Sequence, residues 1–333
     1  MIRTGTMAVP MMLGMNDQEK AVKKIPEKDW ELLRFIDSFK VLTVIQLSAL
    51  SRRSPQVIRR RLRALSEQGF ISTQQQAYGN RRGRPEDLVL LSEAGCRVLQ
   101  KQTGRNGKFQ KNDKYAAPDF VEHELLVNWF FIHLIQIEKK IHQLSVHYFT
   151  QHFSTAEDAP STEHITQIQL PEDDDKLEFI PDGIFTISDS VSNKTLLFFL
   201  EVDMGTETLA SPARGLKDIR QKIVNYQDLF RSGRYKQYEG FFNARLNGFR
   251  VLFVTHSPSR LKTLCQLTAS MPPSDFIWLS DRDRLLSSGL ADEIWVKGGA
   301  LDWQPHTIIG KISVSLQADN QFPLGPSAHG IGR

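Results

Sequence analysis

Two neighbouring apolar runs of this chain carry carboxylates on segments otherwise built largely from Phe, Leu and Ile. The first is FIPDGIFTI at 179–187, and the second is TLLFFLEVDMGTE at 195–207. An ionised carboxylate in an apolar setting costs free energy unless a proton, a cation or a metal compensates it. Any fold that buries these strands must therefore supply partners for Asp182, Glu201 and Asp203.

The alternation of side chains along a strand places these acids relative to one another. Glu201 and Asp203 lie on one face, at the end of the second run. If the two runs form a symmetric hairpin around DSVSNK, residue 188 pairs with residue 195 and Asp182 lies opposite Glu201. Opposed carboxylates repel each other, and Mg²⁺ or Mn²⁺ would relieve the repulsion, because one or two carboxylates with phosphate oxygens and water hold such an ion. Idle acids at exposed, fraying strand ends explain the pattern equally well.

A helix that follows these strands, at about 211–231, brings basic side chains toward them. Its apolar stripe consists of Leu216, Ile219, Ile223, Tyr226 and Phe230. Lys222 and Arg220 flank the stripe on opposite sides, and either could stabilise an attacking hydroxide or the charge of a phosphoryl transition state. A basic side chain whose stem packs on the helix and whose charge reaches water is the more ordinary explanation for each.

An apolar helix at about 118–138 supplies two further candidates through the segment VEHELLVN. His123 and Glu124, near its start, could reach the same site as accessory groups. A capping or solvent-facing role explains them at least as well. The longest apolar stretch of the chain, LLVNWFFIHLIQI, belongs to this helix and is too short and too polar to span a bilayer.

Positive charge is concentrated in the first half of the chain. Between residues 41 and 111 there are 11 Arg and 3 Lys against 4 acids, a local net charge of +10, whereas the whole chain of 333 residues carries +4. Such an asymmetry suggests that one half of the molecule holds a polyanion. Three helices and a hairpin around a Gly/Arg-rich turn predict a winged helix-turn-helix over residues 26–112. Ser54 followed by Pro55 is a strong start signal for the third helix.

The basic module has the residues that a DNA-binding helix needs. In helix-turn-helix proteins the N-terminal end of the recognition helix enters the major groove, where Arg pairs with guanine and Gln with adenine. The candidate contacts are Ser54, Gln56, Arg59, Arg60 and Arg63 on the helix, and Arg81, Arg82 and Arg84 at the hairpin tip. The pattern favours double-stranded DNA as the partner over a merely solvated charged face, and RNA binding or dimerisation through this module stay open.

The rest of the chain predicts a second domain. Residues 1–25 read as a mobile leader and 311–333 as a loose tail, and a polar, basic linker precedes residues 113–310. Strands flanked by helices in that range predict an α/β sandwich.

Cys96 and Cys265 lie far apart without a CxxC pattern, which argues against zinc and against a disulfide framework. With no secretory signal in the sequence, we expect a cytoplasmic protein.

Several segments, in order, resemble the replication-relaxation family, which includes MobC-type plasmid relaxases. They are the winged helix with LSEAG, then HELLVN, PDG, FFLEVDMGTE, KIVNY, RVLFVTHSPSRL and EIW, and together they span roughly residues 30–298. A helix, an Asp on one strand and Glu-x-Asp on the next also look like the PD-(D/E)xK core of restriction-endonuclease-like proteins. The resemblance implies an α+β or α/β fold in which a winged helix precedes a nuclease-like sandwich with a mixed sheet.

The resemblance also implies roles for individual residues. Asp182 and Glu201 would be metal ligands, Asp203 a third or supporting acid, and Lys222 the cation of a Lys-x-x-x-Tyr helix. The nuclease core expects Lys two residues after its Glu, where this chain has Asp203. Either Lys222 replaces that lysine from the helix, or the site is weakened or inactive. The chain also lacks the His-x-His pattern that goes with the metal site of the common tyrosine relaxases.

The resemblance therefore implies a relaxase-like protein of plasmid replication, mobilisation or conjugation. Such a protein recognises an origin on plasmid or mobile-element DNA, alone or with other mobilisation or replication proteins, and nicks it as a Mg²⁺-dependent endonuclease. The alternative is a non-catalytic replication initiator or transcriptional regulator with a degenerate nuclease-like scaffold. The missing lysine of Glu-x-Lys favours the alternative, and the retained Asp182, Glu201 and Asp203 favour the enzyme.

Overall fold

The computed structural model describes residues 25–76, 86–104, 117–149, 180–209, 218–300 and 303–310. The chain divides into two compact units, Met1–Pro118 and Asp119–Arg333. The predicted leader 1–25 lies outside the described residues except for the buried Ile25, the predicted linker 104–114 except for Gly104, and the predicted tail 311–333 entirely. So does the predicted domain boundary at residue 113.

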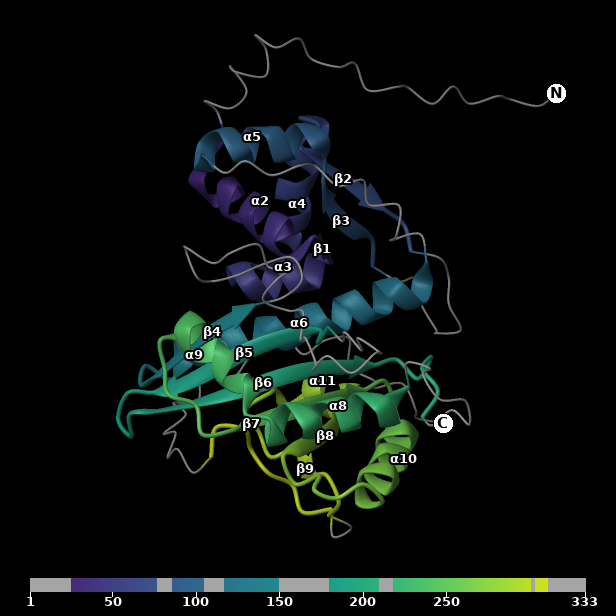
Figure 1. The fold of residues 1–333 in the computed structure, drawn as a ribbon. Coiled ribbons are helices and arrows are strands. Elements are labelled where there is room, and N and C mark those ends of the chain that lie inside the picture. The colour runs from purple at the N-terminus through teal and green to yellow at the C-terminus, as the bar shows by residue number, and fades with distance from the viewer. Residues whose placement is uncertain are drawn as a thin grey trace, which may run out of the picture. The chain divides into compact units, whose positions relative to one another are not determined.

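The N-terminal unit contains the helices and strands predicted for a winged helix-turn-helix (Figure 1). In chain order they are α2 (Glu27–Phe39), β1 (Val41–Leu42), α3 (Val44–Ser51), α4 (Pro55–Glu67), β2 (Ile71–Gln74), β3 (Leu88–Leu91) and α5 (Glu93–Thr103). The strands form an antiparallel sheet in the order β1-β3-β2. Strand β1 is an addition that the sequence analysis missed, because two residues are too few for a pattern.

The helix starts of this unit follow from local sequence. Thr43 caps α3 by accepting a hydrogen bond from the backbone N–H of Gln46, and the side-chain oxygen of Gln46 accepts one from the backbone N–H of Thr43. Ser54 caps α4 and Pro55 occupies its first turn, as predicted. These caps fix the turn between α3 and α4, and Ile58, Leu62 and Leu65 then anchor α4 in the core.

The C-terminal unit is a mixed sheet with helices. Its elements are α6 (Pro118–Lys140), β4 (Leu144–Phe149), β5 (Gly183–Asp189), β6 (Lys194–Asp203), α8 (Ile219–Arg231), η2 (Arg234–Tyr238), α9 (Glu239–Phe242), β7 (Phe249–Thr255), α10 (Pro258–Ala269), β8 (Ile277–Asp281), α11 (Arg282–Ser288) and β9 (Val296–Lys297). The strand order is β4-β5-β6-β7-β8-β9, with β6, β7 and β8 parallel and the other pairs antiparallel. This arrangement confirms a mixed α+β fold; the strand predicted at 165–170 lies outside the described residues.

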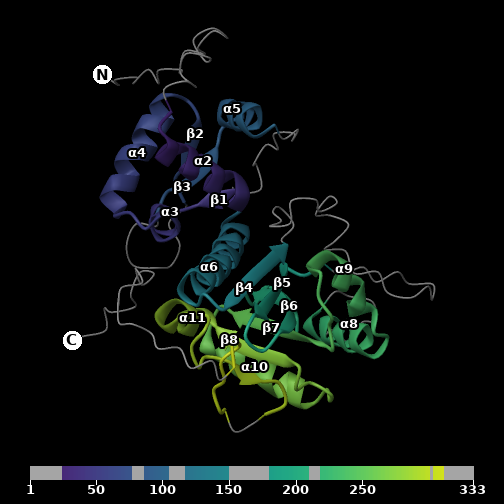
Figure 2. The same ribbon diagram turned by 90° about the vertical axis from the view of Figure 1, so that its left-hand side faces the viewer.

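Helices lie on both faces of this sheet (Figure 2), and apolar side chains pack between them and the strands. On one face Leu197 and Phe199 of β6 belong to a buried cluster with α8 and α10. On the other face Phe131 of α6 stacks on Tyr148 of β4, with ring centroids 4.9 Å apart. The stripe predicted for α8 is correct for Ile219, Ile223 and Tyr226 but wrong for Phe230, which is 42% exposed. Leu229 is buried, whereas the ring of Phe230 stacks on Phe276 and keeps one side exposed. Leu216, also predicted in the stripe, lies outside the described residues.

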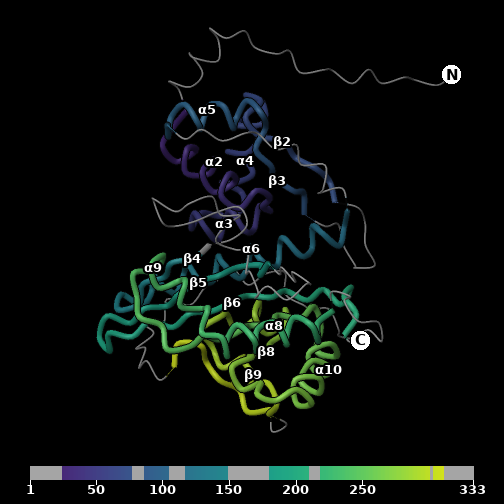
Figure 3. The backbone as a smooth tube through the Cα atoms, in the orientation of Figure 1, coloured from purple at the N-terminus to yellow at the C-terminus, as the bar shows by residue number. Residues whose placement is uncertain are grey.

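The register of the β5–β6 hairpin is the one predicted from symmetry. Ser188 pairs with Thr195 and Gly183 with Leu200. Beyond that pair, the backbone N–H of Asp182 donates to Leu200 O at 3.0 Å, so Asp182 lies at the end of the hairpin beside Glu201 and Val202 rather than in a ladder pair with Glu201. The backbone trace in Figure 3 follows this hairpin and the parallel strand β7 beside it. Among the described residues no helix is both long and apolar enough to cross a membrane.

Candidate functional site

Asp182 connects the hairpin to helix α6. Its Oδ2 accepts a hydrogen bond from the backbone N–H of Val202 at 2.7 Å. Its Oδ1 lies 3.2 Å from Nε2 of His123, a residue of the second turn of α6. The predicted accessory pair is therefore at the site: His123 contacts Asp182 directly, and Glu124 contacts His123 through Oε1 and Nδ1 at 3.8 Å.

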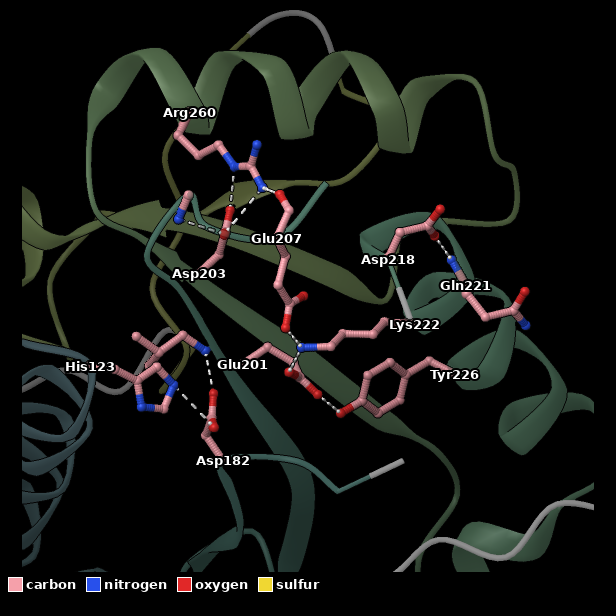
Figure 4. Close-up of polar contacts among 12 residues, drawn as sticks. His123, Asp182, Glu201, Asp203, Glu207, Asp218, Gln221, Lys222, Tyr226 and Arg260 are labelled. Atoms are coloured by element: carbon pink, nitrogen blue, oxygen red, sulfur yellow. Dashed lines mark hydrogen bonds and ion pairs between the residues drawn. The ribbon is translucent and has the colours of Figure 1, made fainter. Parts of the chain in front are cut away.

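Glu201 is the most deeply buried acid of the site, with its side chain 3% exposed. Its Oε1 accepts a hydrogen bond from the hydroxyl of Tyr226 at 2.7 Å, and its Oε2 accepts one from Lys222 Nζ at 3.1 Å. Both donors come from helix α8, where they are four residues apart and so share a face. Of the two basic candidates on this helix, Lys222 turns toward the strand ends and Arg220 is exposed (Figure 4).

Lys222 also binds a second acid, Glu207, from the segment that follows β6. Lys222 Nζ donates to Glu207 Oε1 at 3.0 Å, so one ammonium group bridges two carboxylates. The other oxygen, Glu207 Oε2, is shielded from solvent and accepts no hydrogen bond from the described residues. Glu207 thus brings to the site a buried carboxylate oxygen that has no hydrogen-bond donor among the described residues.

Asp203 does not join the other acids, although it shares a strand face with Glu201. Arg260 of α10 holds it, with Nε 2.5 Å from Oδ2 and a terminal nitrogen 3.2 Å from Oδ1 (Figure 4). Asp203 Oδ1 also accepts the backbone N–H of Gly205 at 2.9 Å. The structure therefore brings together Asp182, Glu201 and Lys222 among the predicted catalytic residues, and pairs Asp203 elsewhere.

Burial and neighbouring charges set the protonation of the site. Burial alone would lower the pKa of His123, but its contacts with Asp182 and Glu124 raise that pKa to about 10. Burial raises the pKa of Glu201 to about 7, against the opposing effect of Lys222. For Lys222, the carboxylates of Glu201, Glu207 and Asp182 outweigh burial and raise the pKa above its ordinary value. Two protein cations, His123 and Lys222, therefore compensate the acids at neutral pH.

The site offers a divalent cation the oxygen ligands that Mg²⁺ prefers. Asp182 and Glu201 lie near each other at the end of the hairpin, and Glu207 Oε2 has no hydrogen-bond donor among the described residues. Within the described ranges, no three His, Cys, Asp or Glu side chains are placed to hold a metal ion together. Since Mg²⁺ needs only one or two carboxylates when phosphate and water complete its shell, these residues fit an ion that is bound together with a phosphate group.

The basic face of α4 lies in the N-terminal unit. The predicted DNA contacts within the described residues are all exposed, namely Ser54, Gln56, Arg59, Arg60 and Arg63. Two other arginines of the same cluster point inward: Arg61 pairs with the buried Asp29 of α2, and Arg53 pairs with Glu31 of α2. Arg81, Arg82 and Arg84 lie outside the described residues.

Sequence reasoning missed Arg260 and Glu207 as functional candidates, and it named Tyr226 without giving it a role in the site. Tyr226 was expected in the apolar stripe, and its spacing of four from Lys222 could have indicated a shared target. Arg260 falls in the first turn of α10, directly after β7, where a basic side chain can reach the end of the adjacent parallel strand. Glu207 gives no pattern signal, because it lies in a segment without regular structure.

Comparison with solved structures gives only slight similarity. A MepR mutant from a multidrug-resistant S. aureus clinical isolate is 16% identical, with 30% of this chain and 68% of that chain covered and a TM-score of 0.22. A MarR mutant from E. coli, complexed with operator DNA, is 16% identical, with 32% and 79% covered and a TM-score of 0.22. TM-scores this low support no inference about the fold or function of this chain. No curated protein matches the chain significantly.

The family comparison is decisive. The replication-relaxation family model matches residues 33–244, which include the winged-helix elements, the β5–β6 hairpin and helix α8. The match agrees with the resemblance drawn from LSEAG, HELLVN, PDG, FFLEVDMGTE and KIVNY. Because it covers more than half of the 333 residues, the chain belongs to the replication-relaxation family.

Proposed function

We propose that this protein binds double-stranded origin DNA through its N-terminal unit and nicks it by metal-assisted phosphodiester hydrolysis in its C-terminal unit. Membership of the replication-relaxation family supports a DNA-related role in replication or mobilisation. The exposed arginines of α4 support duplex DNA as the partner, since phosphate contacts by Arg and Lys dominate DNA affinity.

The observation that carries the nuclease proposal is the position of Lys222. A PD-(D/E)xK core places Asp on one strand, Glu on the next, and a lysine beside that Glu. Here Asp182 lies at the end of the hairpin beside Glu201, and Lys222 reaches Glu201 Oε2 at 3.1 Å from helix α8. The helix thus supplies the ammonium group that position 203 lacks, and the restriction-endonuclease-like reading of the fold rests on this substitution.

The residues of the site would divide the chemistry among them. Asp182 and Glu201 would hold Mg²⁺ or Mn²⁺, which when bound activates water and neutralises the scissile phosphate. Lys222 stabilises negative charge on the phosphate, as a fixed cation in a largely buried site. His123 is held as a cation by Asp182 and Glu124 and would add positive charge beside a bound phosphate. Tyr226 fixes the orientation of the Glu201 carboxylate.

A specific observation favours the second candidate, a non-catalytic initiator or regulator. Every oxygen of Asp182 and Glu201 already has a partner within the protein: His123, Val202, Tyr226 and Lys222. A network that is complete without a ligand can be purely structural. In that case the C-terminal unit is a scaffold that docks other replication or mobilisation proteins.

Nicking of supercoiled plasmid DNA that carries the origin separates the two candidates. We expect the native chain to convert supercoiled DNA to open circles only with Mg²⁺ or Mn²⁺. Glu201→Gln and Lys222→Ala should bind the same DNA in gel shifts and leave it supercoiled. Asp228→Asn is the matched control, because Asp228 lies on α8 and its only ion pair with a described residue is with the exposed Arg231. Native protein that leaves the DNA intact with either metal, or Glu201→Gln that nicks at the native rate, would establish the scaffold.

A further inference from the structure

We propose that Arg260 is a positioning residue of the site: with Asp203 it fixes the segment 204–209 so that Glu207 meets Lys222 beside Glu201. This inference deepens the proposed function and rests on it. We call the arrangement of Asp203, Arg260 and the Glu207 carbonyl the clamp. In this proposal Asp203 binds Arg260 rather than a metal ion, and Arg260 of α10 joins the residues that shape the site.

The clamp is built from three hydrogen bonds of one guanidinium group. Two go to the carboxylate of Asp203, at 2.5 and 3.2 Å, and the third goes to the backbone carbonyl of Glu207 at 2.7 Å. Arg260 thus joins the last residue of β6 to a point four residues further along the chain. A planar guanidinium suits this task, because its fork can span a carboxylate and a carbonyl at once.

The segment 204–209 is held at its other points as well. Gly205 has a positive φ of +79°, and its backbone N–H donates to Asp203 Oδ1. A Cβ at this glycine would lie 2.4 Å from Cε1 of His256, so the segment passes against the end of β7. At the far end, Thr208 O accepts the backbone N–H of Ile219, which ties the segment to the start of α8.

These attachments determine where the side chain of Glu207 can reach. With its carbonyl held by Arg260, Glu207 extends its carboxylate to Lys222 Nζ, which also binds Glu201. Lys222 has two carboxylate partners as long as this segment keeps its path. Loss of the guanidinium would release the Glu207 carbonyl, leave Lys222 with Glu201 alone, and allow the ammonium group to move.

A second Arg–Asp pair at the end of a neighbouring parallel strand provides the matched control. Asp281 ends β8 and forms an ion pair with Arg284 of α11 at 3.2 Å; unlike Arg260, Arg284 lies only three residues from its partner and is 40% exposed. None of the contacts of Arg284 among the described residues involves Glu207 or Lys222. Arg284→Gln therefore removes an Arg–Asp pair without touching the clamp.

The test measures the acylation rate of the Lys222 amine by acetic anhydride, read by mass spectrometry, and the nicking rate at saturating protein. Arg260→Gln should raise the acylation of Lys222 severalfold and slow nicking roughly 10- to 100-fold, the scale of a misplaced catalytic group. Arg284→Gln should change neither quantity. Because acylation needs no activity, it still tests the clamp if the native chain fails to nick and the proposed function falls.

Arg260→Lys separates positioning from charge compensation. A lysine keeps a cation beside Asp203 but cannot span Asp203 and the Glu207 carbonyl, so we expect native-like thermal stability with fast Lys222 acylation and slow nicking. Full rescue of nicking and acylation by Arg260→Lys would overturn the proposal. If Arg260→Gln fails to fold, the double variant Asp203→Asn with Arg260→Gln leaves no unpaired carboxylate, and native acylation of Lys222 in that variant would also contradict the clamp.

Discussion

The two units of this chain use their basic side chains in opposite ways. In the N-terminal unit Arg59, Arg60 and Arg63 are exposed, and none forms an ion pair with a described residue. In the C-terminal unit Lys222 and Arg260 are mostly buried, and each binds two acceptors within the protein. A cation left to solvent is available to a polyanion, whereas a cation that bridges buried acids fixes the geometry of the protein itself.

The same contrast recurs within helix α4. Arg61 is one residue from Arg60, yet its Nε donates to Asp29 Oδ1 at 2.7 Å and it joins α4 to α2. Asp29 is 4% exposed at its side chain, so this pair is a buried link between two helices. The function of each arginine therefore depends on its direction on the helix rather than on its place in a basic run.

The largest expected effect is on the stability of the C-terminal unit. Lys222→Met leaves Glu201 and Glu207 without their shared cation, and removal of one partner of a buried pair costs about 3–5 kcal/mol. We expect the free energy of unfolding, from urea denaturation at pH 8, to fall by about 3 kcal/mol on that scale. Arg59→Met, an exposed control, should change it by less than about 0.5 kcal/mol. Equal losses in the two variants would abolish the distinction between the units.

The pH dependence of stability is a second test of how the buried site of the C-terminal unit differs from the exposed basic face of α4. Burial raises the pKa of Glu201 from 4.5 to about 7 in the folded state, so the native protein binds this proton more tightly than the unfolded chain does. The resulting stabilisation is complete below pH 4.5 and is lost as the pH rises through 7. Relative to Glu201→Gln, which does not titrate, the native chain should lose about 2–3 kcal/mol between pH 5 and pH 8. Parallel stability curves for the two proteins would show that Glu201 does not titrate in this range.

A smaller effect is expected on DNA affinity, and helix α4 contains its own control. Changing Arg59, Arg60 and Arg63 together to Ala should weaken binding roughly 10- to 100-fold and flatten the salt dependence, because fewer counterions are released. Thermal stability should stay native. Arg61→Ala should do the reverse, lowering the melting temperature while leaving the salt slope unchanged, since its partner is Asp29. Gel shifts at several salt concentrations measure both, and identical slopes for native and triple-variant protein would remove α4 from the interface.

Much of the fold could be predicted because its signals are local. Ser54 and Pro55 mark the start of α4 through cap chemistry, and hairpin symmetry is enough to predict the register of β5 and β6. Helix periodicity alone narrows the basic residue of the site to two candidates, Lys222 and Arg220. These inferences depend on residues within a few positions of each other, or on one pairing between adjacent strands.

The partners of the acids could not be predicted, because they come from distant parts of the chain. Sequence reasoning expected repulsion between Asp182 and Glu201, but His123 and Lys222 already compensate them. Asp203 shares the strand face of Glu201, and only the packing of α10 against the sheet shows that Arg260 engages it. Whether a charge on a helix faces water or an acid is decided by tertiary packing, which periodicity does not contain.

The central claim is that the N-terminal unit binds DNA and the C-terminal unit nicks it. The measurement that tests this claim most directly is the rate of nicking of supercoiled origin DNA as a function of protein concentration, with Mg²⁺ or Mn²⁺ present. The variant with Arg59, Arg60 and Arg63 changed to Ala should need more protein for half-maximal rate but reach the native plateau. Glu201→Gln should show no plateau above background at any concentration. A triple variant with a lowered plateau and unchanged half-saturation, or a Glu201→Gln protein that reaches the native plateau, would contradict the account.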